Sequence, residues 1–88
     1  MEKDGVVQQM SGFTIAHFEC IDPARNKRAF YTLSAERGLF CFVLTRCWGR
    51  IGGRGQRLTK LFASETEMLR EYQRLHKKRL QRNYILVD

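Results

Sequence analysis

The segment with the most distinctive chemistry is Arg46–Arg57, RCWGRIGGRGQR, which holds the chain's only tryptophan, several arginines, four glycines and no acid. On a β-strand, side chains alternate between the two faces, so Arg46, Trp48 and Arg50 are predicted to project together. An indole between two guanidinium groups makes a surface that can lie on a sugar or base while the cations hold adjacent phosphates. This pattern favours a nucleic-acid contact.

Gly49 and the three glycines that follow it permit positive φ and a close approach of other backbone. Arg54, Arg57 and Lys60 continue the run of positive charge through the turn, and no acid interrupts it. Each phosphate that such cations neutralise adds a salt-dependent increment to binding. The alternative is that Trp48 is a core aromatic and GGRG is only a hairpin turn, and the residues alone leave both interpretations open.

The formal net charge of +7 is unevenly distributed along the chain. The residues up to Thr45 carry five bases and five acids, whereas the residues from Arg46 onward carry eleven bases and four acids. A pI near 9.8 with one-sided charge indicates a polyanionic partner, with nucleic acid ahead of an anionic membrane surface. The alternative is a solvated basic face that serves solubility alone. We expect a nucleic-acid partner and no membrane association.

The length of 88 residues fits one domain with a single modest core. No apolar run approaches the roughly 18 residues of a membrane span, and the N-terminus lacks the apolar stretch of a secretory signal, so we expect a cytoplasmic protein. Three cysteines, Cys20, Cys41 and Cys47, without C-x-x-C spacing favour reduced thiols. Residues 1–12 have no clear periodicity and are predicted to form a flexible arm before a domain of residues 13–88.

The predicted fold is α+β, an antiparallel β-sheet of about four strands with one long C-terminal helix packed across it. Three stretches rich in aromatic and β-branched residues predict the first strands of a meander: Ala16–Asp22, Ala29–Glu36 and Leu39–Ile51. Arg57–Phe62 is the fourth strand candidate, after the glycine loop. Tyr84–Val87 is a short apolar tail that is expected to dock as an edge strand or to close the core.

The helix is predicted from a capping box of Ser64 and Glu67, followed by about 17 residues of amphipathic periodicity. Asn83 is placed to end it in the left-handed conformation. The basic side of the helix is a second candidate surface for phosphates, with a solvated face and an ion pair between Glu71 and Arg74 as the structural alternative. The cations of this side are Arg70, Arg74, Lys77 and Lys78.

The sequence contains no pattern that predicts catalysis, a metal or a cofactor. His17 and Cys20 are an odd number of residues apart on one predicted strand, so they point to opposite faces and do not easily share an ion. The chain has no G-x-x-x-x-G-K-[ST] run, and its glycine loop lacks the third glycine and the strand-to-helix setting of a dinucleotide site. No acid lies with a His or a nucleophile at a telling spacing. We expect a protein that is not an enzyme.

The string WGRIGGRGQ, followed by LTKLFASETEMLREYQRLHKKRLQRNY, closely resembles the WGR domain, which is named for its Trp-Gly-Arg signature. The usual course of that family is W-G-R-[IV]-G, a variable pair, G-Q, a strand ending in Phe, a Ser-capped helix and a closing Gly-Tyr. The resemblance covers about Ala16–Val87. Two positions depart from the pattern: Asn83 stands where the family prefers Gly, and Ala29 stands where the family often has a Lys.

The resemblance implies recognition of nucleic acid without catalysis. WGR domains occur in poly(ADP-ribose) polymerases, where they help to recognise DNA breaks, and as small standalone bacterial proteins. In the polymerases the signature Trp lies against the sugar of the terminal nucleotide at a 5′ end, and the signature Arg lies at the same contact with DNA and a neighbouring domain. By match of the motif, these roles fall on Trp48 and Arg50, with Gly49 permitting close approach.

The prediction from the sequence is therefore a non-catalytic nucleic-acid-binding domain, with DNA ends or nicks as its ligand ahead of RNA. The alternative is a protein-interaction or adaptor module that uses the same surface. The expected state is a monomer or a weak dimer, because an exposed edge strand favours pairing. The residues predicted to carry nucleic-acid binding are Arg46, Trp48, Gly49, Arg50, Arg54, Arg57 and Lys60.

Overall fold

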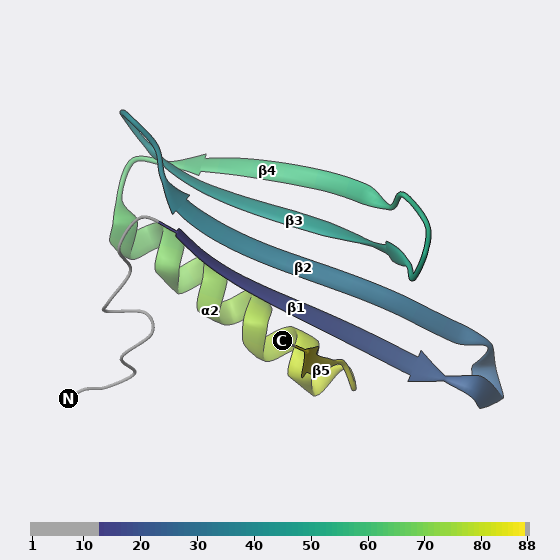
Figure 1. Ribbon diagram of the computed structural model, residues 1–88. Coiled ribbons are helices and arrows are strands. Elements are labelled where there is room, and N and C mark those ends of the chain that lie inside the picture. Colours follow the sequence, from purple (N-terminus) through teal and green to yellow (C-terminus); the bar gives the residue numbers. More distant parts are fainter. Residues whose placement is uncertain (1–12, 88) are drawn as a thin grey trace.

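The computed structural model describes residues 13–87 (Figure 1). The predicted flexible arm of residues 1–12 lies outside the described residues, as does residue 88. The elements in chain order are β1 (Phe13–Asp22), the 3-10 helix η1 (Pro23–Arg25), β2 (Lys27–Arg37), β3 (Phe42–Arg50), β4 (Gln56–Phe62), α2 (Glu65–Gln81) and β5 (Ile85–Val87).

The five strands form one antiparallel sheet in the order β4-β3-β2-β1-β5. The first four strands are the predicted meander. The sheet gains a fifth strand because the apolar tail returns antiparallel to β1, with Leu86 opposite Phe18. Figure 1 shows α2 crossing one face of the sheet, and no described element covers the other face. The predicted α+β class, an antiparallel sheet with one C-terminal helix packed on it, is confirmed.

The core lies between the sheet and α2, and the alternation of side chains along each strand decides which of them enter it. Phe18 of β1, Leu33 of β2 and Met68 of α2 are fully buried. Burying a side chain of this size contributes roughly 1.5–3 kcal/mol relative to leaving it exposed. The other members of the core cluster are Ala16, Tyr31, Ala35, Leu44, Tyr72 and Leu75.

The ends of α2 follow the local sequence signals. The Ser64 side-chain oxygen accepts a hydrogen bond from the Glu67 N–H at 3.3 Å, as expected of an N-cap residue. After the helix, Asn83 adopts the left-handed conformation with φ 70°. The helix runs for 17 residues between these signals, so its predicted length is confirmed.

The turns on either side of β2 have different shapes. Before β2, Asn26 takes a left-handed conformation, with φ 52°, to close η1. After β2, the chain reverses between Gly38 and Cys41, where the Gly38 N–H donates to the Cys41 carbonyl at 2.7 Å. The strand predicted to begin at Leu39 therefore begins at Phe42, because the residues before it form the hairpin turn.

Among the described residues, no helix is both long and apolar enough to cross a membrane. The same part of the chain brings together no group of three His, Cys, Asp or Glu side chains that could hold a metal ion. His17 hydrogen-bonds instead to Thr32, with 2.7 Å between Nδ1 and Oγ1. The thiols of Cys20, Cys41 and Cys47 are free.

The packing of α2 against the sheet predicts a loss of stability in acid. His76 packs edge-on against Phe18, with ring centroids 5.0 Å apart, and burial lowers the pKa of His76 from its ordinary value of 6.5. As the pH falls from about 6.5 toward the lowered pKa, the unfolded chain binds more protons than the folded protein, so stability is lost.

We therefore expect the free energy of unfolding, measured by urea titration, to fall between about pH 7 and pH 5 in the wild type and much less in His76→Gln. Equal pH dependence in the two proteins would show that a group other than His76 titrates in this window.

Candidate nucleic-acid interface

The loop after Trp48 is closed by backbone packing between two glycines. A Cβ on Gly49 would lie 2.6 Å from the Gly55 Cα, and a Cβ on Gly55 would lie 2.5 Å from the Trp48 carbonyl oxygen. Gly55 also has φ 76°, a conformation that favours glycine. These two glycines let the C-terminal end of β3 and the N-terminal end of β4 approach closely. This close approach fixes the backbone that carries Trp48.

Trp48 lines an open cleft between the end of the sheet and the last turns of α2. The cleft has a volume of about 400 Å³, and its aromatic side chains are those of Tyr31, Trp48 and Tyr84. Trp48 is partly buried, because it also packs against the core cluster. The two interpretations of Trp48 are therefore not exclusive: the indole contributes to apolar packing and also lines a cleft. The full lining is Ala29, Tyr31, Arg46, Trp48, Gly49, Arg79 and Tyr84.

Two arginines enter this cleft from different elements, and none of its lining residues is acidic. The Arg46 guanidinium lies 5.7 Å from the centroid of the Trp48 ring. The Arg79 guanidinium lies 4.5 Å from the centroid of the Tyr31 ring and 5.2 Å from that of Tyr84. Cation–π contacts of this kind hold a guanidinium at an aromatic surface without neutralising its charge. The cleft therefore combines aromatic rings with fixed positive charge.

Two polar atoms of the cleft residues are buried without a hydrogen-bond partner among the described residues: the Tyr31 hydroxyl and the Arg79 Nε. Tyr31 as a whole is only 4% exposed. Leaving such groups unpaired costs about 1–3 kcal/mol each. Each of these atoms is therefore a buried polar group that no described residue satisfies.

Arg79 belongs to this site although the sequence patterns do not single it out. It occupies an inward position of the helical period, in line with Tyr72 and Leu75, and so it counts there as part of the core-facing stripe. A cation at a position where the period calls for an apolar residue is the signal that points to it. Tyr84, just after the helix, is indicated in the sequence only by the closing Gly-Tyr of the family pattern.

The predicted strand alternation at the tryptophan is confirmed by the register. Arg46 and Trp48 lie opposite Leu33 and Tyr31, which are buried beneath α2, so both side chains project from the helix-covered face. Arg50 follows on the same alternation at the exposed end of β3.

The other predicted binding residues are more dispersed. Lys60 is opposite Leu44 and lies on the helix-covered face, but outside the lining of the Trp48 cleft. Arg54 is exposed in the loop. Arg57 is opposite Cys47, so it projects from the uncovered face, away from Trp48. A single surface does not hold all the predicted cations, because alternation sends neighbours on β4 to opposite sides.

A comparison with protein families matches residues 14–88 to the WGR domain. The chain belongs to the WGR domain family. It is also 36% identical over 69 residues to an uncharacterized protein, y4dW, of Sinorhizobium fredii. The aligned part is 77% of this chain and 34% of that relative, so the chain spans about a third of the length of the relative that it matches.

The WGR domain is in general a non-catalytic, nucleic-acid-binding module. In this WGR domain the signature Trp48, Gly49 and Arg50 are the last three residues of β3. The first of them lines the aromatic cleft, and the third lies beside a second pocket at the same end of the sheet.

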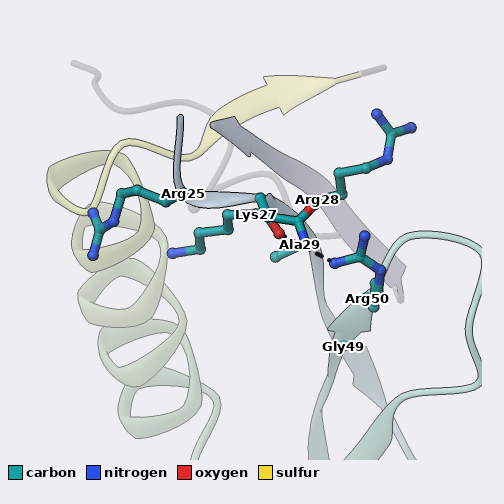
Figure 2. Close-up of a pocket in the computed structure, with 7 residues that line it drawn as sticks. Arg25, Lys27, Arg28, Ala29, Gly49 and Arg50 are labelled. Carbon is teal, nitrogen blue, oxygen red and sulfur yellow. Dashed lines mark hydrogen bonds between the residues drawn. The ribbon is translucent and has the colours of Figure 1, made fainter. Parts of the chain in front are cut away.

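The second pocket of the WGR domain lies at the turn between β1 and β2 and has a volume of about 370 Å³. Figure 2 shows Arg25 and Lys27 extending toward the C-terminal end of α2, and Arg28 and Arg50 on the other side of the turn. The residues that line it are Arg25, Asn26, Lys27, Arg28, Ala29, Gly49 and Arg50.

The basic side of α2 in the WGR domain is partly neutralised. Arg74 donates two hydrogen bonds to the Glu71 carboxylate, at 2.9 and 2.7 Å, so the predicted ion pair is present. The hydrogen bond from Arg74 is the main cause that lowers the pKa of Glu71. Of the four predicted cations, those exposed are Arg70, Arg74 and Lys77, and Lys78 is partly buried.

Proposed function

We propose that this WGR domain binds DNA at strand ends or nicks, with the terminal nucleotide in the Trp48 cleft. The observation that carries the proposal is an aromatic cleft into which Arg46 and Arg79 project and which no acid lines. Aromatic rings contribute roughly 1–3 kcal/mol per stacked base in single-strand binders, and guanidinium groups bind phosphates through charge-assisted hydrogen bonds.

The form of the cleft supports a preference for strand ends. Its volume of about 400 Å³ lies in the range of pockets that bind one small ligand. The bases inside a duplex are stacked on both sides, so their faces cannot meet the Trp48 ring without being unstacked, which costs a few kcal/mol. A terminal nucleotide at a strand end has a free base face and a free side of its sugar, and at a nick the interrupted backbone lets the terminal nucleotide leave the stack more easily. It therefore reaches the cleft at a lower cost than a nucleotide inside an intact duplex.

A protein partner is the second candidate, and the hairpin between β2 and β3 favours it. Leu39 and Phe40 at this turn are 88% and 92% exposed, and no described side chain shields them. Two adjacent large apolar side chains with this exposure form a small patch that a protein partner can bury. The hairpin lies at the opposite end of the sheet from the β3–β4 loop (Figure 1), so both partners could be bound together.

The proposal is tested by titrating the protein against intact duplex DNA, a 5′-phosphorylated nicked duplex, single-stranded DNA and single-stranded RNA. We expect the nicked duplex to bind most tightly. If about three to five phosphates are neutralised, the association constant should fall as roughly the third to fifth power of the salt concentration. Equal, weak binding to all four probes would contradict end recognition and leave only a basic surface. No binding at low salt would leave the protein-interaction candidate.

A further inference from the structure

The face of the sheet that α2 does not cover carries an exposed apolar stripe. Directly paired residues of neighbouring strands lie on the same face, so the register assigns each strand residue to one of the two faces. The large apolar side chains of the uncovered face that are 52–65% exposed follow β1 and β5, with one more on β4. They are Phe13, Ile15, Ile21, Ile85 and Leu61. An apolar surface of this extent indicates a face that a partner covers.

The uncovered face is electrically balanced, unlike the chain as a whole. Its charged strand residues are two acids and two bases: Glu19, Glu36, Arg28 and Arg57. The chain carries a formal net charge of +7, so the surplus positive charge lies elsewhere. A face without net charge offers a polyanion no attraction, whereas two copies of a basic chain repel each other least when they meet through such a face. The charge therefore favours a second copy of this chain as the partner.

The charges along β2 are arranged so that two copies complement each other. Arg28 and Glu36 lie near opposite ends of β2, and Thr32 lies midway between them. A two-fold axis that crosses the strands at Thr32 sets the Glu36 carboxylate of each copy against the Arg28 guanidinium of the other. Neither side chain forms an ion pair with another described residue, so both charges are available for this contact.

The same axis pairs the ends of the apolar stripe. His17 on β1 is directly opposite Thr32, and it lies midway between Phe13 and Ile21. The axis therefore sets Phe13 of each copy against Ile21 of the other. Arg57 is exposed on the edge strand β4, where a long side chain keeps its charge in water at the rim of an interface. The face is thus self-complementary in both its apolar and its charged parts.

The size of the uncovered face suits a dimer of modest affinity. The first four strands contain 7 to 11 residues each. With a rise of about 3.3 Å per residue and a spacing of about 4.8 Å between strands, they span roughly 600 Å². Two such faces bury about 1,200 Å² in total, which is the lower end of the range for specific interfaces. Two sheets that pack face to face also form the layered arrangement of a β-sandwich.

We propose that this WGR domain forms a two-fold symmetric dimer through the uncovered face of its sheet. Pairing through the edge strand β4 is less favourable, because it brings Arg57 and Lys60 of both copies into one interface. The face-to-face dimer leaves both Trp48 clefts open, since they lie on the helix-covered face. The dimer therefore does not depend on the proposed function.

The oligomeric state of the full chain is measured by sedimentation equilibrium over a wide range of protein concentration. We expect a dissociation constant on the order of 10 μM. Phe13→Ser removes an apolar side chain from both copies at once and should raise this constant at least about tenfold. Phe13 is 56% exposed, so its replacement disturbs the fold of the monomer little.

Leu80→Ser is the matched control, because Leu80 is 48% exposed but lies on α2, on the other side of the sheet. It should leave the dissociation constant within about twofold. A chain that is monomeric at every concentration would overturn the inference. So would equal weakening of the dimer by Phe13→Ser and Leu80→Ser.

A charge exchange tests the two-fold arrangement. Arg28→Glu alone, or Glu36→Arg alone, sets like charges against each other at both ends of the interface and should weaken the dimer about tenfold or more. The variant with both substitutions restores opposite charges and should return to within about threefold of the wild-type constant. If the losses of the two single variants simply add in the double variant, this arrangement of the two copies is wrong.

Cys47 distinguishes a dimer through the face from one through the edge. It is directly opposite Thr32, at the centre of the uncovered face, and its thiol is free. In Cys41→Ser the other thiol, that of Cys20, is buried. The rate at which Cys47 reacts with a disulfide reagent should therefore fall as the protein concentration rises through the dissociation constant. A dimer whose Cys47 reacts at the rate of the monomer would indicate pairing through β4 and would contradict the proposal.

Discussion

Trp48→Ala is expected to weaken binding of the nicked duplex by about 5- to 150-fold, which corresponds to the roughly 1–3 kcal/mol of one stacking contact. The substitution removes the indole from the cleft and leaves Arg46 without its aromatic neighbour at 5.7 Å. It also removes a partly buried ring from the edge of the core, so the free energy of unfolding should fall by about 1–2 kcal/mol. The two effects are measured by fluorescence anisotropy and by urea titration.

A matched variant separates the two effects. Phe62, like Trp48, is partly buried against the core cluster, but it pairs with Phe42 at the far end of the sheet. Phe62→Ala should therefore reduce stability by a similar amount, about 1–2 kcal/mol, and leave the affinity for DNA within about twofold. If Phe62→Ala weakens binding as much as Trp48→Ala does, the affinity follows stability alone, and Trp48 is only a core residue.

Gly55→Ala is expected to destabilise the protein by about 3 kcal/mol or more, the largest effect of any single methyl group added to the signature loop. The new Cβ would lie 2.5 Å from the Trp48 carbonyl oxygen and 2.8 Å from the Phe30 ring. Overpacking of this kind costs about 1–3 kcal/mol, and the left-handed conformation of residue 55 adds about 1–2 kcal/mol. In a domain of this size the melting temperature should fall by more than about 10 °C.

Gly52→Ala is the control for this substitution. Gly52 also has a positive φ, 90°, but a Cβ at Gly52 would meet no atom within 4 Å. The two variants share the conformational cost, so the difference in their unfolding free energies isolates the steric contact. We expect Gly52→Ala to lose only about 1–2 kcal/mol and to bind DNA like the wild type. Equal losses in the two variants would mean that the close approach of the β3 and β4 backbones contributes nothing.

Much of the fold follows from local signals in the sequence. Ser64 and Asn83 bracket α2 as predicted, because capping and left-handed turns depend on a few neighbouring residues. The register places Arg46 and Trp48 on one face, because alternation is a local property of a strand. The start of β3 differs from the prediction, since apolar residues such as Leu39 have strand propensity yet lie in the hairpin turn.

The sequence predicted only the part of the candidate site that lies in the signature segment. The other residues that line the cleft are distant from this segment along the chain. In the sequence, Arg79 only occupies an inward-facing position of an amphipathic helix. When α2 packs on the sheet, the Arg79 guanidinium lies against the rings of Tyr31 and Tyr84. Arg57, in contrast, belongs to the basic run of the sequence but projects from the uncovered face, since it pairs with Cys47. Proximity in sequence therefore grouped with Trp48 four cations that do not line its cleft, Arg50, Arg54, Arg57 and Lys60, and it missed Arg79.

The sequence by itself determined the family, the order of the elements and the position of the signature loop. These properties depend on short-range spacing: the glycines after Trp48, the cap at Ser64 and the alternation of strand residues. The tertiary structure decided which charges act together. It brings Arg25 and Lys27 to the end of β3, because β1 and β2 are joined there, and it sets Arg79 against the aromatic rings. Electrostatic fields add through space and not along the chain, so a count of charges by sequence segment does not locate a binding surface.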